Sequence, residues 1–399
     1  EHKEGHAQLA QLLIDREVIF AEDVERIFGK RPWTSRAEEL LEAQMKADAE
    51  RMAEERAKEL EQEAKALEAD LDLDIAKELI DDDAYWTYED KPEATRKLSG
   101  MALNRIKDKV PGLFGGSADL APSNISDMKE VPYFSPENYA GRNIHYGVRE
   151  IAMTAIANGI TLYGLRGYGA TFFVFSDYTK PVLRLSSIMR IPTLMIFSHD
   201  SIGVGEDGPT HEPVEQPAML RSLPNFHMFR PADATETLAA WYSAVTSKET
   251  PTAIVTTRQA LPQLAGSSKE ALKGGYILED SSKETPDAII IASGSEVNLA
   301  VKAKELLACE NIDVRVVSMP CMDIFEEQSA EYKEEVLPKS VRARVAVEAL
   351  TDFGWGKYVG LDGATLTMTG FGASAPQNLL FEKFGFTAEN VVKKVKEVL

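Results

Sequence analysis

Cysteine is scarce in this sequence, which has only Cys309 and Cys321 among 399 residues. Two cysteines cannot build the disulfide framework on which small secreted domains depend. The scarcity favours a reducing compartment, and we expect the chain to be cytoplasmic. Both cysteines are expected to be small core or near-surface residues rather than reactive ones.

Long apolar runs are missing as well. No stretch approaches the roughly 20 apolar residues that a membrane-spanning helix needs, so no membrane partner is expected. The chain starts at Glu1 instead of Met, and the residues that follow are charged and lack the apolar core of a signal peptide. We therefore expect a fragment or a processed product.

Basic residues are fewer than acidic ones, 44 Lys and Arg against 64 Asp and Glu, which gives a formal net charge of −20. The excess lies mainly in residues 1–90, which hold 27 acidic and 12 basic side chains. Nucleic-acid binding requires clustered Lys and Arg, so the composition argues against a nucleic-acid partner.

The first 80 residues have the pattern of a helical segment. A short apolar stripe predicts one helix from about residue 7, and a second helix is predicted over 21–28, where Gly29 ends it. Residues 35–80 are rich in Glu, Ala, Lys, Arg and Leu and predict a long acidic helix. Its heptads are too irregular for a coiled coil.

From about residue 92, short apolar strands alternate with helices. This alternation predicts parallel sheets with helices on both faces, and the polar stretch 263–273 is the expected linker between two such domains. The predicted strands lie within 190–198, 251–257, 287–292, 313–319, 344–349 and 365–369.

One loop stands out for its polar groups. Residues 199–211, after a predicted strand, contain two histidines, three carboxylates and three glycines. Open α/β sheets bind ligands at the carboxyl ends of strands, glycines allow close approach of the backbone, and histidines move protons near neutral pH. The pattern indicates a ligand site; a polar loop with incidental histidines is the alternative.

Four ordered blocks carry a resemblance to a known family. Their order and spacing over residues 92–399 resemble transketolase, a thiamine-diphosphate enzyme. The resemblance implies an α/β chain of two three-layer α/β/α domains, a pyrimidine-binding domain at 92–264 and a C-terminal domain at 274–399, preceded by the helical segment 1–80. The blocks are ATRK at 94–97, GGSADLAPSN at 115–124, HYGVREIAM at 145–153 and GEDGPTHEPVEQ at 205–216.

The resemblance implies residues for the aminopyrimidine side of thiamine diphosphate. Glu150 matches the catalytic glutamate that hydrogen-bonds this ring; on its own it would be an ordinary glutamate at the start of a predicted helix over 151–162. Phe172, Phe175 and Tyr178 match pocket-lining aromatic residues, and their spacing would put them on one side of a helix. Such a stripe is otherwise more often core. The implied cofactor-binding residues are Asp119, Glu150, Phe172, Phe175 and Tyr178.

The resemblance also implies a substrate side for sugar phosphates. Two guanidinium groups, an imidazole and a hydroxyl suit a dianionic phosphate; without the motif, the arginines would be solvated surface residues. The resemblance implies transfer of a two-carbon ketol unit in the pentose phosphate pathway, with His199, His211 and Glu150 as catalytic residues. The implied phosphate-binding residues are Arg96, Ser123, His199 and Arg258, and the implied hydroxyl-binding residues are Asp207 and His211.

Transketolases hold the cofactor's diphosphate and Mg²⁺ through a Gly-Asp-Gly motif that this sequence does not contain. We therefore expect no metal site in the chain, with Mg²⁺ bound only by a missing domain or a partner chain. The chain alone is expected to be inactive. A homodimer or a separate diphosphate-binding subunit is the expected assembly.

Residues 13–33 resemble the C-terminal tail of a membrane-anchored FtsH-type AAA+ zinc protease, without its catalytic machinery. His2 and His6 do not form a zincin motif, because that motif has a glutamate directly after its first histidine. We interpret the chain as a fusion of two unrelated coding pieces; a docking or targeting module is the alternative.

Other hypotheses remain open. The chain could belong to another thiamine-diphosphate ketol enzyme, such as a dihydroxyacetone synthase or a deoxyxylulose phosphate synthase. It could be the second subunit of a split transketolase, or an inactive fragment with only an assembly role. A function of the protease-like tail is a further alternative, and only the N-terminal segment supports it.

Overall fold

The computed structural model of the chain describes residues 2–30, 36–71 and 75–399, with all side chains in these ranges except those of 37–38 and 59–71. The remaining residues, including 31–35 at the end of the protease-like stretch, lie outside the described part. The chain divides into two compact units, Glu1–Ala69 and Asp70–Leu399, and each is treated by itself.

The first unit is helical, as the sequence predicts. α1 (Lys3–Arg16) and α2 (Ala21–Phe28) pack on each other, with the rings of His6 and Phe28 5.5 Å apart. α3 (Arg36–Leu71) is a long helix whose described side chains are almost all exposed. This exposure agrees with the prediction of a solvated acidic helix, but α3 ends at Leu71, and residues 75–80, predicted as part of the same helix, form a separate one.

The second unit begins with two short helices, α4 (Ile75–Ile80) and α5 (Asp83–Trp86). In α4 the side chain of Leu79 is fully buried, and in α5 the side chain of Tyr85 is almost fully buried. The Tyr85 hydroxyl donates a hydrogen bond to the carbonyl of Leu238 at 2.5 Å. These contacts attach both helices to the first sheet domain.

A six-stranded parallel sheet forms the centre of the first α/β domain. Its strands are β2 (Leu113–Ser117), β3 (Asn143–His145), β4 (Arg166–Phe172), β5 (Leu194–Ser198), β6 (His227–Phe229) and β7 (Thr252–Thr256), in the order β3-β2-β4-β5-β7-β6. Its helices are α6 (Thr95–Ile106), α7 (Ala121–Asn124), α8 (Glu150–Leu162), α9 (Ser176–Met189), α10 (Gln216–Arg221) and α11 (Ala234–Thr246).

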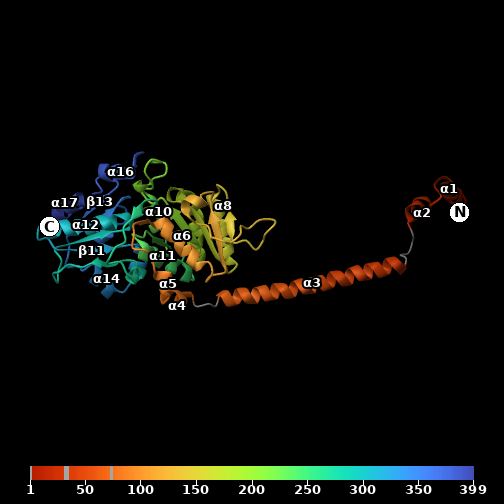
Figure 1. Ribbon diagram of the computed structural model, residues 1–399, viewed down its shortest axis with the longest axis horizontal. Helices are drawn as coiled ribbons and strands as arrows, with labels where there is room; N and C mark the ends of the chain where they lie inside the picture. Colours follow the sequence, from red (N-terminus) through yellow and green to blue (C-terminus); the bar gives the residue numbers. More distant parts are fainter. Residues whose placement is uncertain (1, 31–35, 72–74) are drawn as a thin grey trace. The chain divides into compact units, whose positions relative to one another are not determined.

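The layers of this domain follow from the apolar strands. All residues of β5, with the sequence LMIFS, are buried, as a sheet covered on both faces requires. α6 and α11 cover one face and α8 and α9 the other (Figure 1). A two-stranded antiparallel ribbon, β1 (Glu93–Ala94) with β8 (Ala260–Leu261), closes the domain.

A second sheet, of five strands, follows. Its strand order is β13-β12-β10-β11-β9, and all strands are parallel except β9. The expected linker contains the 3₁₀ turn η3 (Lys269–Lys273), whose Ala271 is buried. The strands are β9 (Tyr276–Glu279), β10 (Ala288–Ala292), β11 (Val314–Ser318), β12 (Arg344–Glu348) and β13 (Ala364–Thr367).

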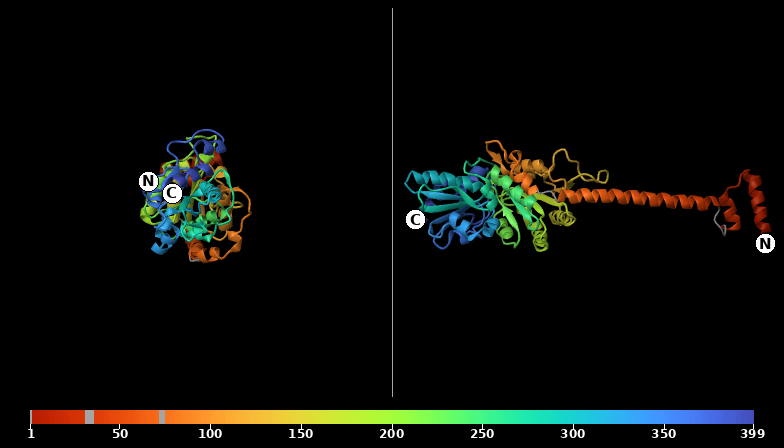
Figure 2. Two further views of the ribbon diagram at one scale, coloured as in Figure 1. Left: turned by 90° about the vertical axis from the view of Figure 1, so that its left-hand side faces the viewer. Right: turned by 90° about the horizontal axis from the view of Figure 1, so that it is seen from below.

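Helices cover both faces of this second sheet, which lies beside the first (Figure 2). α12 and α17 pack on one face and the shorter α13, α14 and α15 on the other. The fold class expected from the sequence, α/β with parallel sheets after a helical segment, is confirmed. The helices are α12 (Val297–Ala308), α13 (Met322–Glu327), α14 (Ala330–Val336), α15 (Gly356–Val359), α16 (Gln377–Lys383) and α17 (Ala388–Val398).

Buried ion pairs join the two sheet domains. Arg230, after β6, lies 2.7 Å from Asp200 and 2.5 Å from Glu296. Arg221 on α10 forms two hydrogen bonds with Glu348 of β12, at 2.8 and 2.7 Å. Burial alone would raise the pKa of Glu348, but Arg221 and Arg230 hold it at about 2, so the carboxylate stays charged.

Candidate active site

The carboxyl ends of four neighbouring strands meet at one edge of the six-stranded sheet. Phe172 of β4 lies opposite Ser198 of β5, which lies opposite Thr256 of β7. Ser117, the last residue of β2, lies opposite Ala170. The segments that follow these strands carry most of the predicted site residues. The fold therefore brings them to the edge where open α/β sheets bind ligands.

His199 directly follows β5 and is 3% exposed. Its backbone is left-handed, with φ of 66°, which is uncommon for a residue other than glycine. The ring centroid lies 3.9 Å from that of Phe172. Burial, followed by the charges of Arg96 and Arg258, lowers the pKa of His199 to about 3. In the free protein the imidazole is therefore neutral at physiological pH.

A chain of buried hydrogen bonds supports this ring. Nδ1 of His199 lies 2.8 Å from Ser198 Oγ, which donates to Asn124 Oδ1 at 2.7 Å. Nδ2 of Asn124 donates to Ser117 Oγ at 2.9 Å, and Ser117 Oγ donates to the carbonyl of Ala170 at 3.0 Å. Ser117, Asn124 and Ser198 were not among the predicted site residues, although the first two lie in the block GGSADLAPSN that carries the resemblance.

Two guanidinium groups lie near the same ring. Arg96 on α6 donates to the carbonyl of Ser123 at 2.7 Å, and Arg258, after β7, donates to the carbonyl of Val204 at 2.9 Å. Burial and the charge of Arg258 lower the pKa of Arg96, because two like charges are held close together. A bound anion would relieve this repulsion. The structure thus brings the four predicted phosphate-binding residues together.

Aromatic rings line the same edge. Phe172 and Phe175 are stacked with centroids 6.0 Å apart, and His211 meets them edge-on at 6.0 and 5.7 Å. Tyr178 lies 6.1 Å from Phe175 and is 54% exposed. The placement of the three predicted aromatic residues on one helix is wrong. Phe172 ends β4, Phe175 closes the 3₁₀ turn η1 (Phe173–Phe175), and Tyr178 lies on α9, so a turn between strand and helix gathers them.

Glu150 is the first residue of α8, where the sequence predicts a helix start, and it is buried. Within the described residues, its carboxylate has neither a hydrogen-bond partner nor an ion pair. The carboxylate oxygens are not among the fully buried side-chain atoms without a partner, so they are open to solvent and to a ligand. The carboxylate therefore fits a ligand that brings its own hydrogen-bonding nitrogen, as an aminopyrimidine does.

Asp119 and Asp207 are more exposed than the other predicted site residues that follow β2 and β5. Asp119 follows β2 by two residues with φ of 64°, and Asp207 lies in the loop 199–211; both are exposed. Neither carboxylate forms a hydrogen bond or ion pair with another described side chain. Both nevertheless lie on segments that leave the carboxyl ends of strands.

The C-terminal domain packs on the loop 199–211. Ser374 Oγ donates to the carbonyl of Glu206 at 2.6 Å. Glu212, just after the loop, is buried against Gly372, where a methyl group would lie 1.7 Å from its carboxylate. Neither carboxylate oxygen has a hydrogen-bond partner of good geometry, although the backbone amide of Ala373 lies close enough to lower the pKa in part. Burial is the main cause that raises the pKa of Glu212 to about 7. Sequence reasoning missed this residue because the second domain buries it.

The residues present fit one side of thiamine diphosphate. The aromatic wall and Glu150 suit its aminopyrimidine ring, and the cationic groups suit a phosphate ester. Among the described residues, no group of three or more His, Cys, Asp or Glu side chains is arranged to hold a metal ion. In the same part of the chain, no helix has both the length and the apolar character of a membrane span.

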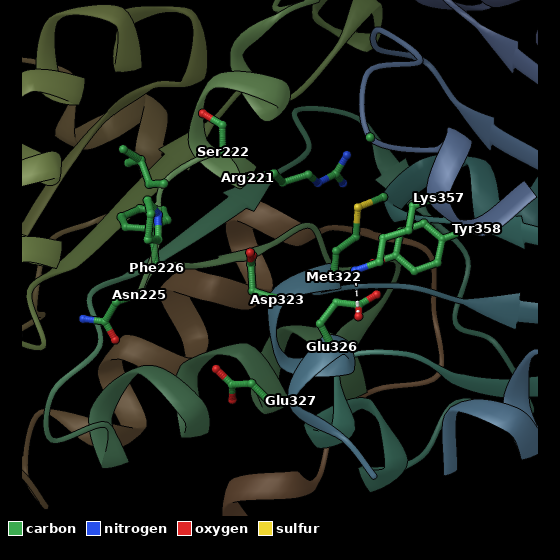
Figure 3. A pocket seen from close by; sticks show the side chains of 13 residues that line it. Arg221, Ser222, Asn225, Phe226, Met322, Asp323, Glu326, Glu327, Lys357 and Tyr358 are labelled. Atoms are coloured by element: carbon green, nitrogen blue, oxygen red, sulfur yellow. Dashed lines mark ion pairs between the residues drawn. The ribbon is translucent and has the colours of Figure 1, made fainter. Parts of the chain in front are cut away.

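A pocket of about 460 Å³ opens between the two sheet domains and shares no residue with this cluster (Figure 3). Arg221 and Phe226 line one side, and Asp323 and Glu326 line the other. Lys357 pairs with Glu326 at 2.7 Å, and burial raises the pKa of Asp323 to about 6. None of the predicted site residues lines this pocket.

A glutamate that opens α8 and stacked aromatic rings at the end of β4, in a parallel-sheet domain followed by a second sheet domain, fit the thiamine-diphosphate-dependent class. Within that class, residues 91–263 match the family model of the transketolase pyrimidine-binding domain. Residues 274–387 match the transketolase-like C-terminal domain. The chain thus carries these two domains of the transketolase family. Neither match includes residues 1–90, so the protease-like resemblance there stays a prediction.

Relatives agree with this assignment. The chain is 52% identical over 311 residues to the transketolase of Bacillus subtilis (strain 168), which covers 77% of this chain and 47% of that protein. A probable transketolase of Streptococcus pneumoniae is 53% identical over 308 residues, again 77% and 47%. The chain spans about half the length of the curated relatives it matches.

Two solved structures extend the comparison. Transketolase from Leishmania mexicana superposes with a TM-score of 0.79 at 39% identity, covering 95% of this chain and 55% of that one. A structure described as a split gene transketolase, an inactive β4 tetramer, gives a TM-score of 0.62 at 25% identity. That match covers 77% of this chain and 98% of the other.

Proposed function

We propose that this chain supplies the aminopyrimidine-binding and sugar-phosphate-binding half of a transketolase site. The reaction is transfer of a two-carbon ketol unit between phosphorylated sugars of the pentose phosphate pathway. The observation that carries the proposal is the gathering of Arg96, Arg258 and His199 at the strand ends, where His199 packs on the stacked phenylalanines. The cationic side suits the phosphate of a sugar, and the aromatic side suits the aminopyrimidine ring of the cofactor.

The cationic side holds the phosphate of the sugar. Arg96 and Arg258 offer planar guanidinium groups that can each make two hydrogen bonds to phosphate oxygens. Ser123 adds a hydroxyl and His199 a ring nitrogen. Asp207 and His211 bind sugar hydroxyls near the reacting carbon.

The aromatic side holds the aminopyrimidine. Phe172, Phe175 and Tyr178 would hold the ring, Glu150 would exchange a proton with its nitrogen, and Asp119 would help to bind the thiazolium part. When bound, thiamine diphosphate supplies the electron sink for cleavage of a carbon–carbon bond. His211, which contacts both phenylalanines, is placed to hold or move a substrate proton between the two sides.

A second chain completes the site with the diphosphate and Mg²⁺ cradle. The outer faces of α8 and α9 leave large apolar side chains exposed, among them Ile151 at 56% and Ile188 at 59%. Such a face supports burial by another subunit. A second copy or a separate diphosphate-binding subunit would cover it. The similarity to the split gene transketolase supports the second-subunit arrangement.

The N-terminal unit is proposed to stand outside this chemistry. Its resemblance to the tail of an FtsH-type protease supports an origin as a fused segment. The cytoplasm is the proposed location, which the free thiols of Cys309 and Cys321 support.

The proposal is tested by reconstitution. The chain is mixed with a separately expressed diphosphate-binding domain of the Bacillus subtilis relative, thiamine diphosphate and Mg²⁺, and ketol transfer from xylulose 5-phosphate is assayed. We expect activity in the mixture that falls at least about 100-fold in Glu150→Gln, because general acid–base groups contribute on this order. Glu249→Gln, an exposed control, should retain activity.

Association of the two chains is followed by sedimentation in the same mixtures. Association with cofactor binding but without transfer would contradict the enzymatic proposal and leave an assembly role. Transfer with a different donor preference would favour another thiamine-diphosphate ketol enzyme.

A further inference from the structure

We propose that the buried hydrogen bonds behind His199 fix it in one neutral tautomer, so that a phosphate monoester binds there together with one proton. Asn124 and Ser198 are then positioning residues of the phosphate site. The tautomer assignment stands on this chain's geometry alone, whereas the choice of phosphate as ligand rests on the proposed function.

The direction of each hydrogen bond in this series follows from the bond farthest from His199, the one that Ser117 makes. The single hydrogen of Ser117 Oγ is donated to the Ala170 carbonyl, so Ser117 accepts from Asn124 Nδ2. This orients the amide with Oδ1 toward Ser198, whose hydrogen it accepts. Ser198 Oγ has then only lone pairs for the ring, so the proton of neutral His199 lies on Nδ1.

The other ring nitrogen, Nε2, has no hydrogen-bond partner within the described residues. The Phe172 ring packs against the imidazole. The charged or titratable groups that act on it are Arg96 from α6, Arg258 from the segment after β7 and His211 from the loop after η2 (Ile202–Val204). All three oppose a second proton on the ring.

A bound dianionic phosphate, in contrast, favours a second proton on the His199 ring. Unprotonated Nε2 is only an acceptor, so it repels phosphate oxygens until it takes up a proton and becomes a donor. The proton comes from solvent, or from a phosphate monoanion whose O–H bond breaks, and it forms an N–H bond at Nε2; no other bond changes. The bound complex therefore holds one proton more than the free protein and the dianion.

Nitrogen-15 NMR of the histidine-labelled full chain tests the tautomer. We expect Nδ1 protonated and Nε2 unprotonated from pH 6 to 8, with the signal assigned by its loss in His199→Gln. Ser198→Ala should shift the ring toward the Nε2 tautomer. Thr210→Ala, which removes the hydroxyl 2.9 Å from Nδ1 of His211, should leave His199 unchanged. A proton on Nε2 in the unaltered chain overturns the assignment, whether or not the variants fold.

Calorimetry with inorganic phosphate tests the coupled proton. At pH 8, titrations in buffers of different ionisation enthalpy should show uptake of about one proton per phosphate, and affinity should fall about tenfold from pH 8 to 9. Binding without proton uptake overturns this half of the proposal. Absence of phosphate binding, with the tautomer as assigned, counts against the proposed function and not against the hydrogen-bond chain.

Discussion

The guanidinium of Arg230 lies 2.7 Å from the carboxylate of Asp200 in the junction between the two sheet domains. Both side chains are fully buried, and Arg230 also contacts Glu296 of the C-terminal domain. Because Asp200 follows His199 directly, the second domain anchors the loop that carries the predicted substrate residues. The C-terminal domain therefore shapes the site although all predicted site residues lie in the first domain.

Removal of a carboxylate from this junction should be costly. Glu348→Ala leaves the buried Arg221 without its partner, and we expect the free energy of unfolding to fall by about 3–5 kcal/mol. Urea denaturation measures the change. Glu249→Ala breaks the exposed pair with Arg190 and should cost less than about 1 kcal/mol. Equal losses in the two variants would show that the junction contributes no more than a surface pair.

His199 should make the protein sensitive to acid. Its pKa falls from an ordinary 6.5 to about 3 on folding, so the unfolded chain binds the extra proton between these values. Its contribution to stability is present above pH 6.5 and is lost as the pH falls toward 3. His199→Gln should reduce the loss of stability between pH 7 and 4.5 by about 1–3 kcal/mol.

The measurement is urea denaturation of wild type and variant at both pH values. His145→Gln, at an exposed strand end, serves as the control for loss of a histidine. An unchanged pH dependence in His199→Gln would mean that folding does not lower the pKa of this imidazole.

Glu212 should have the opposite pH dependence. Folding raises the pKa of Glu212 from 4.5 to about 7, so the folded chain holds the extra proton between these values. Stability from this carboxyl is fully present below pH 4.5 and is lost as the pH rises through 7. Glu212→Gln keeps the shape of the neutral carboxyl and should be more stable than wild type at pH 8 by about 1–3 kcal/mol.

Thermal unfolding of both proteins at pH 5 and pH 8 checks this expectation. Glu215→Gln, exposed on the same segment, provides the control. A Glu212→Gln variant that is less stable than wild type at pH 8 would contradict the prediction. It would show that the charged carboxylate makes a favourable interaction in the folded protein.

The secondary structure was predictable where local pattern decides it. The apolar run AIIIA at 288–292 coincides with β10, and the predicted helix 151–162 with α8. The aromatic residues were misplaced because helical spacing was assumed across the end of a strand. Spacing alone cannot show where a strand turns into a helix.

The candidate site was predictable only as a set of residue types. The left-handed backbone of His199 and the hydrogen bonds of Asn124 depend on contacts between distant segments. The burial of Glu212 depends on Gly372, more than 150 residues away and in the other domain. Such features arise from packing and leave no periodic pattern in the sequence.

Arg258 should act on the phosphate of the substrate and not on its carbon skeleton. In the reconstituted enzyme, Arg258→Ala should raise the KM for xylulose 5-phosphate roughly 10- to 100-fold, since a hydrogen bond between charged groups contributes about 1.5–3 kcal/mol. The KM for a ketose without phosphate should change little, because the lost guanidinium has no partner there. Steady-state kinetics with both donors measure the difference, and Arg190→Ala on the exposed surface is the matched control. An equal rise for both donors would place Arg258 among residues that shape the site rather than bind phosphate.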